Sequence, residues 1–313
     1  MSLSNPTEEN QSGAILAKRS DGWRSTTKML SVLFKSRVVA LLVLAAIAGA
    51  FLGAGGWPGI WILLLVMVSG WMAASGAAGL NEYIERGSDA LMGRTSGRPL
   101  VHNQVKPRWV LWTGILLIVI PSLVILPYNR ALSFFLILGA FIYVCIYTLW
   151  LKPRTSLNIV IGGAAGSAAV LSGAAAVGAW QEPAVLALAG LIFLWTPSHF
   201  WSLAILYRND YARADVPMLP VNSTTRGAAW WVFLHTGAAG LVALLLIFTP
   251  DLGIVYLIPV AIASIDMVIR NIRLILDPTP SNARALFLSS NLYLMIVLLS
   301  ICIGTAINGI WLL

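Results

Sequence analysis

The chain has very little cysteine, histidine and charge for its length of 313 residues. It contains 2 Cys and 3 His, and only 10% of its residues are charged. Both cysteines, Cys145 and Cys302, lie inside apolar runs, where free cysteine is usually a buried thiol. The sequence therefore offers no material for a disulfide framework, a zinc site or an iron-sulfur cluster. No Ser-His-Asp arrangement or cysteine nucleophile is found either.

Apolar residues are abundant where charge is missing. They make up 58% of the chain, and the mean hydropathy is +0.84. A soluble core of this size could not bury so much apolar surface, so the composition indicates a polytopic membrane protein. The net charge of +8 would otherwise suggest nucleic acid, but that function needs the basic residues on a soluble face. We therefore expect no nucleic-acid partner.

Nine apolar runs are long enough to cross a hydrocarbon core as helices. They are continuous rather than alternating, which favours helices over barrel strands and predicts an all-α membrane protein. The runs are residues 37–57, 60–80, 109–127, 131–151, 157–180, 184–207, 228–249, 252–271 and 286–311.

The basic residues alternate from one loop to the next. All but one of the 20 Lys and Arg residues fall on one side of this nine-span arrangement, and Arg130 is the exception. Basic residues near span ends stay in the cytoplasm, so we expect a cytoplasmic N-terminus and an outer C-terminus in the plasma (inner) membrane. Residues 1–36 carry no signal-peptide pattern and are expected to form a polar cytoplasmic tail before a transmembrane domain at 37–313.

Two long connections stand out on the cytoplasmic side. Residues 81–108 follow the second span and residues 208–227 follow the sixth. They occupy equivalent places if spans one to four and five to eight form two four-helix halves of a parallel repeat, with the ninth helix added. The fifth span is rich in Gly, Ala and Ser, which predicts close helix packing.

The first connection contains oxygen-bearing side chains at helical spacing. Asn81, Glu85 and Asp89 are four residues apart, so on a helix they would line one face. Mg²⁺ takes such oxygen ligands and shares carboxylates with phosphate oxygens. Arg94 and Arg98, again four apart, could bind phosphate oxygens in bidentate fashion. The alternative is an ordinary solvated loop.

The second connection repeats this chemistry. It contains Asn209, Asp210 and Asp215, flanked by Arg208 and Arg213. Two oxygen-rich, arginine-flanked clusters at matching positions of one bundle suit a diphosphate held through bound metal. This coincidence favours a metal and diphosphate site over two solvated loops.

Two further positions are candidates for substrate contact. Lys152 and Arg154 follow the fourth span and could reach the same diphosphate, or they mark the cytoplasmic side. His199 lies near Pro197 inside the sixth span, where ionisable groups are costly and tend to face a cavity. A hydrogen-bonded packing role is the alternative for His199.

Five strings together carry a family resemblance. The chain resembles the protoheme IX farnesyltransferases, or heme O synthases, of the UbiA-type intramembrane prenyltransferase superfamily. The strings are NEYIERGSDALMGRTSGRPL, YTLWLKPRTSLNIVIGGAAGS, LWTPSHFWSLAI, DYARADVPMLPV and ARALFLSSNLYL. The resemblance runs from about residue 37 to the C-terminus, and the third and fourth strings indicate the heme branch.

The resemblance implies transfer of the farnesyl group of farnesyl diphosphate to a vinyl group of heme B with addition of water, giving heme O and diphosphate. Heme O would serve terminal oxidases. Matching positions imply Asn81, Glu85 and Asp89 as ligands of one Mg²⁺, and Asp210 with its neighbours as ligands of a second. These four residues are the candidate catalytic set, and His199 is the candidate heme contact. Heme A synthase or a terminal oxidase is a candidate partner protein.

The sequence departs from the family pattern within both motifs. Glu85 stands where Asp is usual, Gly87 and Ser88 replace other residues, Asn209 stands where a second acid is common, and Asp215 replaces a usual Gly. Two other functions remain as alternatives. One is prenyl transfer to another acceptor, such as a quinone or chlorophyll precursor, and the more remote one is anion transport.

Overall fold

The computed structural model describes residues 26–311, and side chains as far as residue 307. Every regular element in this range is a helix, which confirms the all-α prediction. Nine helical spans are long and apolar enough to cross a membrane within the described residues. The elements are α2 (Ser36–Ala54), α3 (Ile60–Leu91), α4 (Pro107–Ile125), α5 (Arg130–Phe141), the π-helical η1 (Ile142–Leu151), α6 (Asn158–Gly162), α7 (Ala164–Ala176), α8 (Pro183–Leu206), α9 (Arg208–Arg213), α10 (Leu219–Asn222), α11 (Thr225–Leu245), the 3-10 helix η2 (Leu246–Phe248), α12 (Gly253–Leu276) and α13 (Pro280–Trp311).

The predicted span boundaries are close to those of the helices, with one large difference. Helix α3 does not end near residue 80 but continues to Leu91, where Met92 adopts an extended conformation. The apolar run ends at the first polar residue, but the backbone hydrogen bonds of a helix do not require apolar side chains, so the helix can continue past the end of the run. The first charged segment is therefore mostly a helical extension of the second span.

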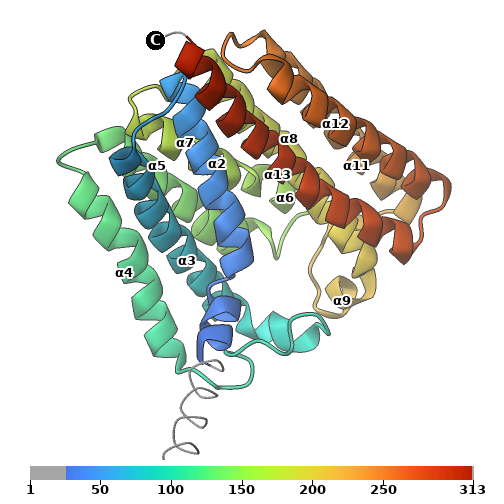
Figure 1. Cartoon of the computed structure of the whole chain (residues 1–313). Coiled ribbons are helices and arrows are strands. Elements are labelled where there is room, and N and C mark those ends of the chain that lie inside the picture. Colours follow the sequence, from blue (N-terminus) through green and yellow to red (C-terminus); the bar gives the residue numbers. More distant parts are fainter. Residues whose placement is uncertain (1–25, 312–313) are drawn as a thin grey trace, which may run out of the picture.

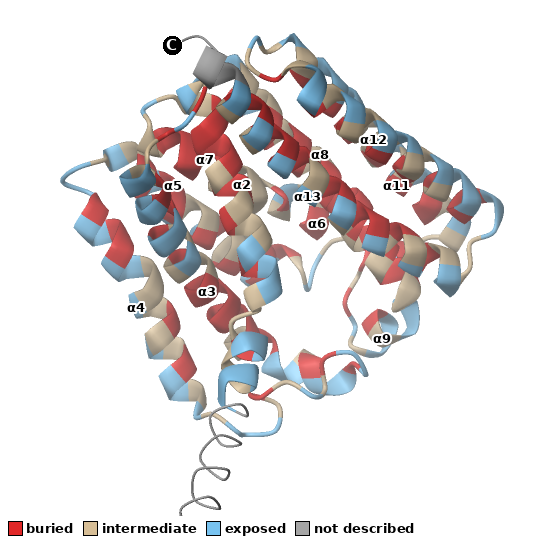
Figure 2. Cartoon of the chain, in the orientation of Figure 1, coloured by how far each residue is buried: buried red, intermediate tan, exposed pale blue. Residues whose placement is uncertain are grey.

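Many large apolar side chains are exposed on the outside of the bundle, among them several of α4 and α12. Figure 2 shows exposed residues along both helices. Large aromatic side chains are exposed near both ends of the spans, as in proteins that cross a bilayer. At one end they are Trp57, Trp61, Tyr128 and Phe248, and at the other Trp109, Trp112, Trp150, Trp230 and Trp231.

The two aromatic belts fix the depth of residues on α3. From Trp61 in the first belt, a hydrocarbon thickness of roughly 30 Å corresponds to about 20 residues of helix. Asn81 therefore lies near the level of the second belt, and the remainder of α3 extends beyond the hydrocarbon core.

The helices pack as two four-helix halves. Helices α2, α3, α4 and α5 contact one another in sequence, and so do α7, α8, α11 and α12. Helix α7 joins the halves by packing against α2 and α5, and α13 packs against α12, α8 and α2. The ninth span, α13, thus contacts both halves. In Figure 1 the C-terminal end of α13 and helix α9 lie at opposite ends of the bundle.

A reciprocal pair of glycines forms the contact between α2 and α7. A Cβ atom added to Gly49 would lie 2.2 Å from the carbonyl oxygen of Val170, and one added to Gly173 would lie 1.7 Å from that of Ala46. Each glycine thus lies against the backbone carbonyl of the residue three positions before the other glycine. Small residues allow this backbone approach in membranes, so the close packing predicted from the fifth span is confirmed.

The expected polar tail is partly within the described residues. Residues 26–33 are helical, and Leu33 is fully buried beside Leu100 and Val110. The chain then turns at Lys35, which has a left-handed conformation with φ 49°, and enters α2. Residues 1–25 lie outside the described part, and the boundary at residue 36 stays a prediction.

Candidate active site

The last turns of α3 present four buried polar side chains on one face. Asn81, Glu82, Glu85 and Asp89 are each less than a tenth exposed. Buried carboxylates are costly unless they are paired or bound to a cation. The solvated-loop alternative for these residues is wrong, because they are helical and buried.

Basic side chains from three other segments pair with this face. Lys35 donates a hydrogen bond to Asn81, and Lys152 forms an ion pair with Glu85. Arg98 pairs with Asp89, and its Nε lies 3.5 Å from Oε1 of Glu82. Two predicted metal ligands, Glu85 and Asp89, are thus in direct contact with two residues predicted to bind diphosphate.

The pKa values of the basic partners reflect this environment. Burial is the largest influence on Lys152 and would lower its pKa, but the Glu85 carboxylate outweighs burial and the pKa is raised. The pKa of Arg98 is likewise raised, since Asp89 and Glu82 outweigh its burial. Burial, followed by the charge of Arg98, lowers the pKa of Lys35 to about 7. Lys152 and Arg98 are therefore held as cations, while Lys35 titrates near neutrality.

The π-helical segment η1 positions Lys152 and several polar groups. The amide of Lys152 bonds the carbonyl of Tyr147, and the Thr148 hydroxyl donates to the carbonyl of Tyr143, both five residues back. Thr148 Oγ1 also accepts a hydrogen bond of 2.9 Å from Asn81 Nδ2. The Tyr143 hydroxyl accepts one of 3.3 Å from Lys35. π-Helical turns occur frequently at functional sites.

The second charged segment meets the first through Asp210. Its Oδ2 accepts a hydrogen bond of 3.2 Å from the backbone amide of Arg94, and its Oδ1 is bonded by Arg213. The Arg94 guanidinium lies 5.7 Å from the centre of the Tyr207 ring. Figure 1 shows α9 at the same end of the bundle as the end of α3. The two charged segments are thus in contact at Asp210.

Four predicted site residues are not drawn into this cluster. Asn209 and Asp215 are exposed, and Asp215 has a left-handed conformation with φ 53° in the turn after α9. Arg208 donates to the carbonyl oxygen of Ser223 at 3.4 Å. Arg154 is exposed and donates to the carbonyls of the preceding helical turn. Their assignment to metal or diphosphate stays a prediction.

Sequence reasoning missed Lys35, Glu82, Tyr143 and Thr148. Glu82 offered a signal, because residues 82, 85 and 89 share one helix face at spacings of three and four. Thr148 stood one helical turn before Lys152 and could have been found in the same way. Lys35 gave no signal, since it was one of several basic residues before the first span.

His199 lies in a separate, largely aromatic environment on α8. Its ring stacks on Trp195 with centroids 4.5 Å apart and on Phe287 with centroids 4.6 Å apart. Its Nδ1 lies 2.7 Å from the Ser290 hydroxyl on α13. The packing role foreseen for His199 is thus present, and its role as a heme contact stays a prediction.

The oxygen-bearing residues fit a hard divalent cation in chemistry. Among residues 26–307, no three His, Cys, Asp or Glu side chains converge in a metal-binding group. Among the described residues, Oε2 of Glu82 is buried and has no hydrogen-bond partner, and Glu82 shares one helix face with Glu85 and Asp89. Carboxylate and amide oxygens are suitable Mg²⁺ ligands, so this face of α3 offers the right donor atoms. In this structure those oxygens pair with basic side chains.

Comparison with known proteins agrees with this fold. The model of the UbiA prenyltransferase family matches residues 20–310. The protoheme IX farnesyltransferase of Metallosphaera sedula is 42% identical over 86% of this chain and 93% of its own. That of Sulfurisphaera tokodaii is 40% identical over 87% and 91%.

Solved structures of other proteins share this fold. A digeranylgeranylglyceryl phosphate synthase superposes with a TM-score of 0.73 at 17% identity, covering 90% of this chain and 99% of its own. A UbiA homologue of Archaeoglobus fulgidus, bound to DMAPP and Mg²⁺, gives a TM-score of 0.58 at 13% identity, with 87% and 98% covered. Since the family model matches nearly the whole chain, this integral membrane protein belongs to the UbiA prenyltransferase family.

Proposed function

We propose that this protein transfers the farnesyl group of farnesyl diphosphate to a vinyl group of heme B with addition of one water, giving heme O and diphosphate. The observation that supports it most directly is the buried acidic face of α3 with its basic partners, at the level of one aromatic belt. A diphosphate on a lipid tail needs both a polar site at the membrane surface and an apolar space beside it. The two relatives at 40–42% identity are protoheme IX farnesyltransferases, which supports heme as the acceptor.

The acidic residues would hold Mg²⁺ in this function. Asn81, Glu85 and Asp89 would supply oxygens to one ion and Asp210 to a second, with Glu82 as an additional donor. Asn209 and Asp215 are weaker candidates, because both are exposed. When bound, Mg²⁺ neutralises the charge of the diphosphate. Its presence in a related structure with DMAPP supports the same requirement here.

The basic residues would bind the phosphate oxygens. Lys152 and Arg98 are paired with the carboxylates of Glu85 and Asp89. When a diphosphate binds with its cations, the phosphate oxygens would pair with Lys152 and Arg98, and the cations with the carboxylates. As the carbon–oxygen bond breaks, negative charge accumulates on the departing diphosphate, and these fixed cations stabilise it. Arg94, Arg154 and Arg208 are candidates for the same role at the rim, since all three are exposed.

The heme would lie near His199 on the α8 and α13 side. The aromatic rings of Trp195 and Phe287 hold the imidazole in place, and the Ser290 hydroxyl bonds Nδ1. Since Nδ1 is bonded to Ser290, Nε2 would be the ring nitrogen that contacts the heme. Apolar surroundings would exclude water from the electrophilic farnesyl carbon.

We further propose the plasma (inner) membrane as the location, with the N-terminus and both charged segments cytoplasmic and the C-terminus outside. The distribution of basic residues supports this orientation. The candidate site then faces the compartment that contains farnesyl diphosphate. Heme A synthase or a terminal oxidase would be the partner that receives the product.

The test is reconstitution of the purified chain with heme B, farnesyl diphosphate and Mg²⁺. We expect heme O, identified by mass, and an equal amount of diphosphate, both absent without Mg²⁺. Consumption of a quinone or chlorophyll precursor with heme untouched would favour the alternative acceptor. Movement of an anion across vesicles without any product would favour transport.

A further inference from the structure

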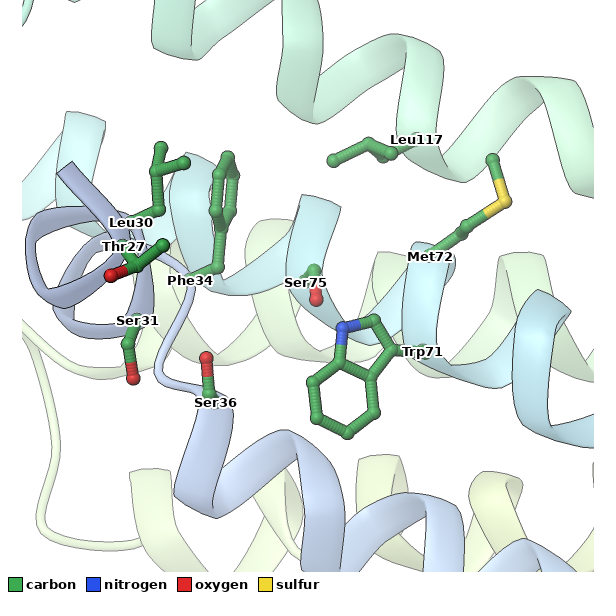
Figure 3. A pocket seen from close by; sticks show the side chains of 9 residues that line it. All are labelled: Thr27, Leu30, Ser31, Phe34, Ser36, Trp71, Met72, Ser75 and Leu117. Carbon is green, nitrogen blue, oxygen red and sulfur yellow. The ribbon is translucent and has the colours of Figure 1, made fainter. Parts of the chain in front are cut away.

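A groove opens beside α3. It lies between residues 26–36, α3 and α4, and has a volume of about 340 Å³. Figure 3 shows Leu30, Phe34, Met72, Trp71 and Leu117 around the open space. Thr27, Ser31, Ser36 and Ser75 add hydroxyl groups to the lining, whose surface is nonetheless mostly apolar.

Phe34 separates the groove from the candidate active site. Ser75, Gly79 and Glu82 follow one another along a single face of α3. The Phe34 ring covers Gly79, since a Cβ there would lie 3.1 Å from Cε1 of Phe34. Ser75 thus lies in the groove on one side of this ring, and Glu82 lies in the acidic cluster on the other.

Ser75 contributes a polar atom that no other described residue uses. Its side chain lines the groove, the residue is 5% exposed, and its Oγ has no hydrogen-bond partner among the residues that the structure describes. Other serines in these helices donate to the carbonyl four residues back, as Ser69 and Ser122 do at 2.7 and 2.8 Å. A buried hydroxyl without a partner indicates a ligand that supplies one.

The depth of the groove indicates what this ligand is. Ser75 precedes Asn81, at the belt level, by about six residues, or roughly 9 Å of helix. The groove therefore opens among the lipid chains of the adjacent leaflet. With about 30 Å³ for a group the size of a water molecule, its volume accommodates roughly ten methylene-sized groups.

The surface around the membrane-surface end of the groove is basic. Lys28 lies beside the lining residues of the first helix, Arg37 follows Ser36, and Arg108 begins α4. All three are exposed, and neither residues 26–37 nor residues 100–110 contain Asp or Glu. Basic side chains at the membrane surface attract anionic lipid headgroups.

We propose that this groove binds one acyl chain of an anionic glycerophospholipid, whose headgroup lies against Lys28, Arg37 and Arg108. Ser75 then donates a hydrogen bond to an oxygen of the lipid or to a water that accompanies it. Because Phe34 lines the groove and the next residue, Lys35, bonds Asn81, the bound lipid also holds this turn against α3. The site is independent of which acceptor the enzyme uses.

Native mass spectrometry of the delipidated full chain tests the proposal. Titration with dioleoylphosphatidylglycerol is compared with dioleoylphosphatidylcholine. We expect the chain to retain one phosphatidylglycerol molecule at least tenfold more tightly than phosphatidylcholine. Ser75→Phe and Leu117→Trp, which fill the groove from different helices, should each abolish retention. Leu123→Trp, on a lipid-facing position of α4 that is 59% exposed, is the matched control and should not.

The headgroup is tested by Lys28→Gln combined with Arg37→Gln. This variant should lose the preference for phosphatidylglycerol, whereas Arg273→Gln, at an exposed position on α12, should keep it. Equal retention of the two lipids by the unaltered chain would overturn the proposal. So would undiminished retention in both groove variants. Tighter lipid binding after removal of residues 1–25 would show that the chain itself occupies the groove.

Discussion

Replacing Gly173 by alanine should destabilise the contact that joins the two halves of the bundle. The added Cβ would lie 1.7 Å from the carbonyl oxygen of Ala46, whereas ordinary contact begins at 3.4 Å. The oxygen belongs to the backbone, so helices α2 and α7 must move apart. Such overpacking typically costs about 1–3 kcal/mol, and we expect the upper part of this range because no flexible side chain can yield.

The magnitude can be measured as a shift in melting temperature in detergent. With roughly 2–4 °C for each kcal/mol in a large domain, Gly173→Ala should melt about 4–12 °C below the unaltered chain. Gly237→Ala is the matched control, since Gly237 also lies within a helix but a Cβ there meets nothing within 4 Å. That variant should melt unchanged or slightly higher, because alanine favours helix by about 0.5–1 kcal/mol. Equal melting of both variants would refute the reasoning.

Three further predictions concern the candidate site. Asp89→Asn should reduce heme O formation at least about 100-fold while the protein stays folded, and a near-normal rate would contradict its metal role. Lys152→Met should destabilise the fold by about 3–5 kcal/mol because Glu85 stays buried and unpaired, and adding Glu85→Gln should restore most of the loss in chemical denaturation. His199→Phe should weaken heme binding, followed by its visible absorbance, but leave the affinity for farnesyl diphosphate unchanged; a parallel loss of both would indicate a purely structural role.

The spans could be predicted from sequence because the bilayer imposes a length and a composition on each helix. The extension of α3 could not, because two of its buried polar residues pair with basic residues far away in the chain. Lys35 lies 46 residues from Asn81, and Lys152 lies 67 residues from Glu85. Only the packed bundle brings these groups together.

Within the second segment, local backbone geometry limited the prediction. Asp210 and Asp215 are only five residues apart, and their spacing suggested a shared metal. The turn after α9 places Asp215 in a left-handed conformation at the exposed surface, while Asp210 faces the loop that follows α3. Residue types alone do not specify such a turn.

The π-helical turn in η1 makes the position of Lys152 sensitive to chain length. A π turn accommodates one more residue than an α turn, so it rotates everything after it by about 100° relative to a regular helix. Deleting one residue between Ile142 and Leu151 would give a helix with better hydrogen bonding, and would direct Lys152 away from Glu85. In this segment a single-residue deletion would therefore be more harmful to function than most substitutions, because regular geometry and the ion pair exclude each other.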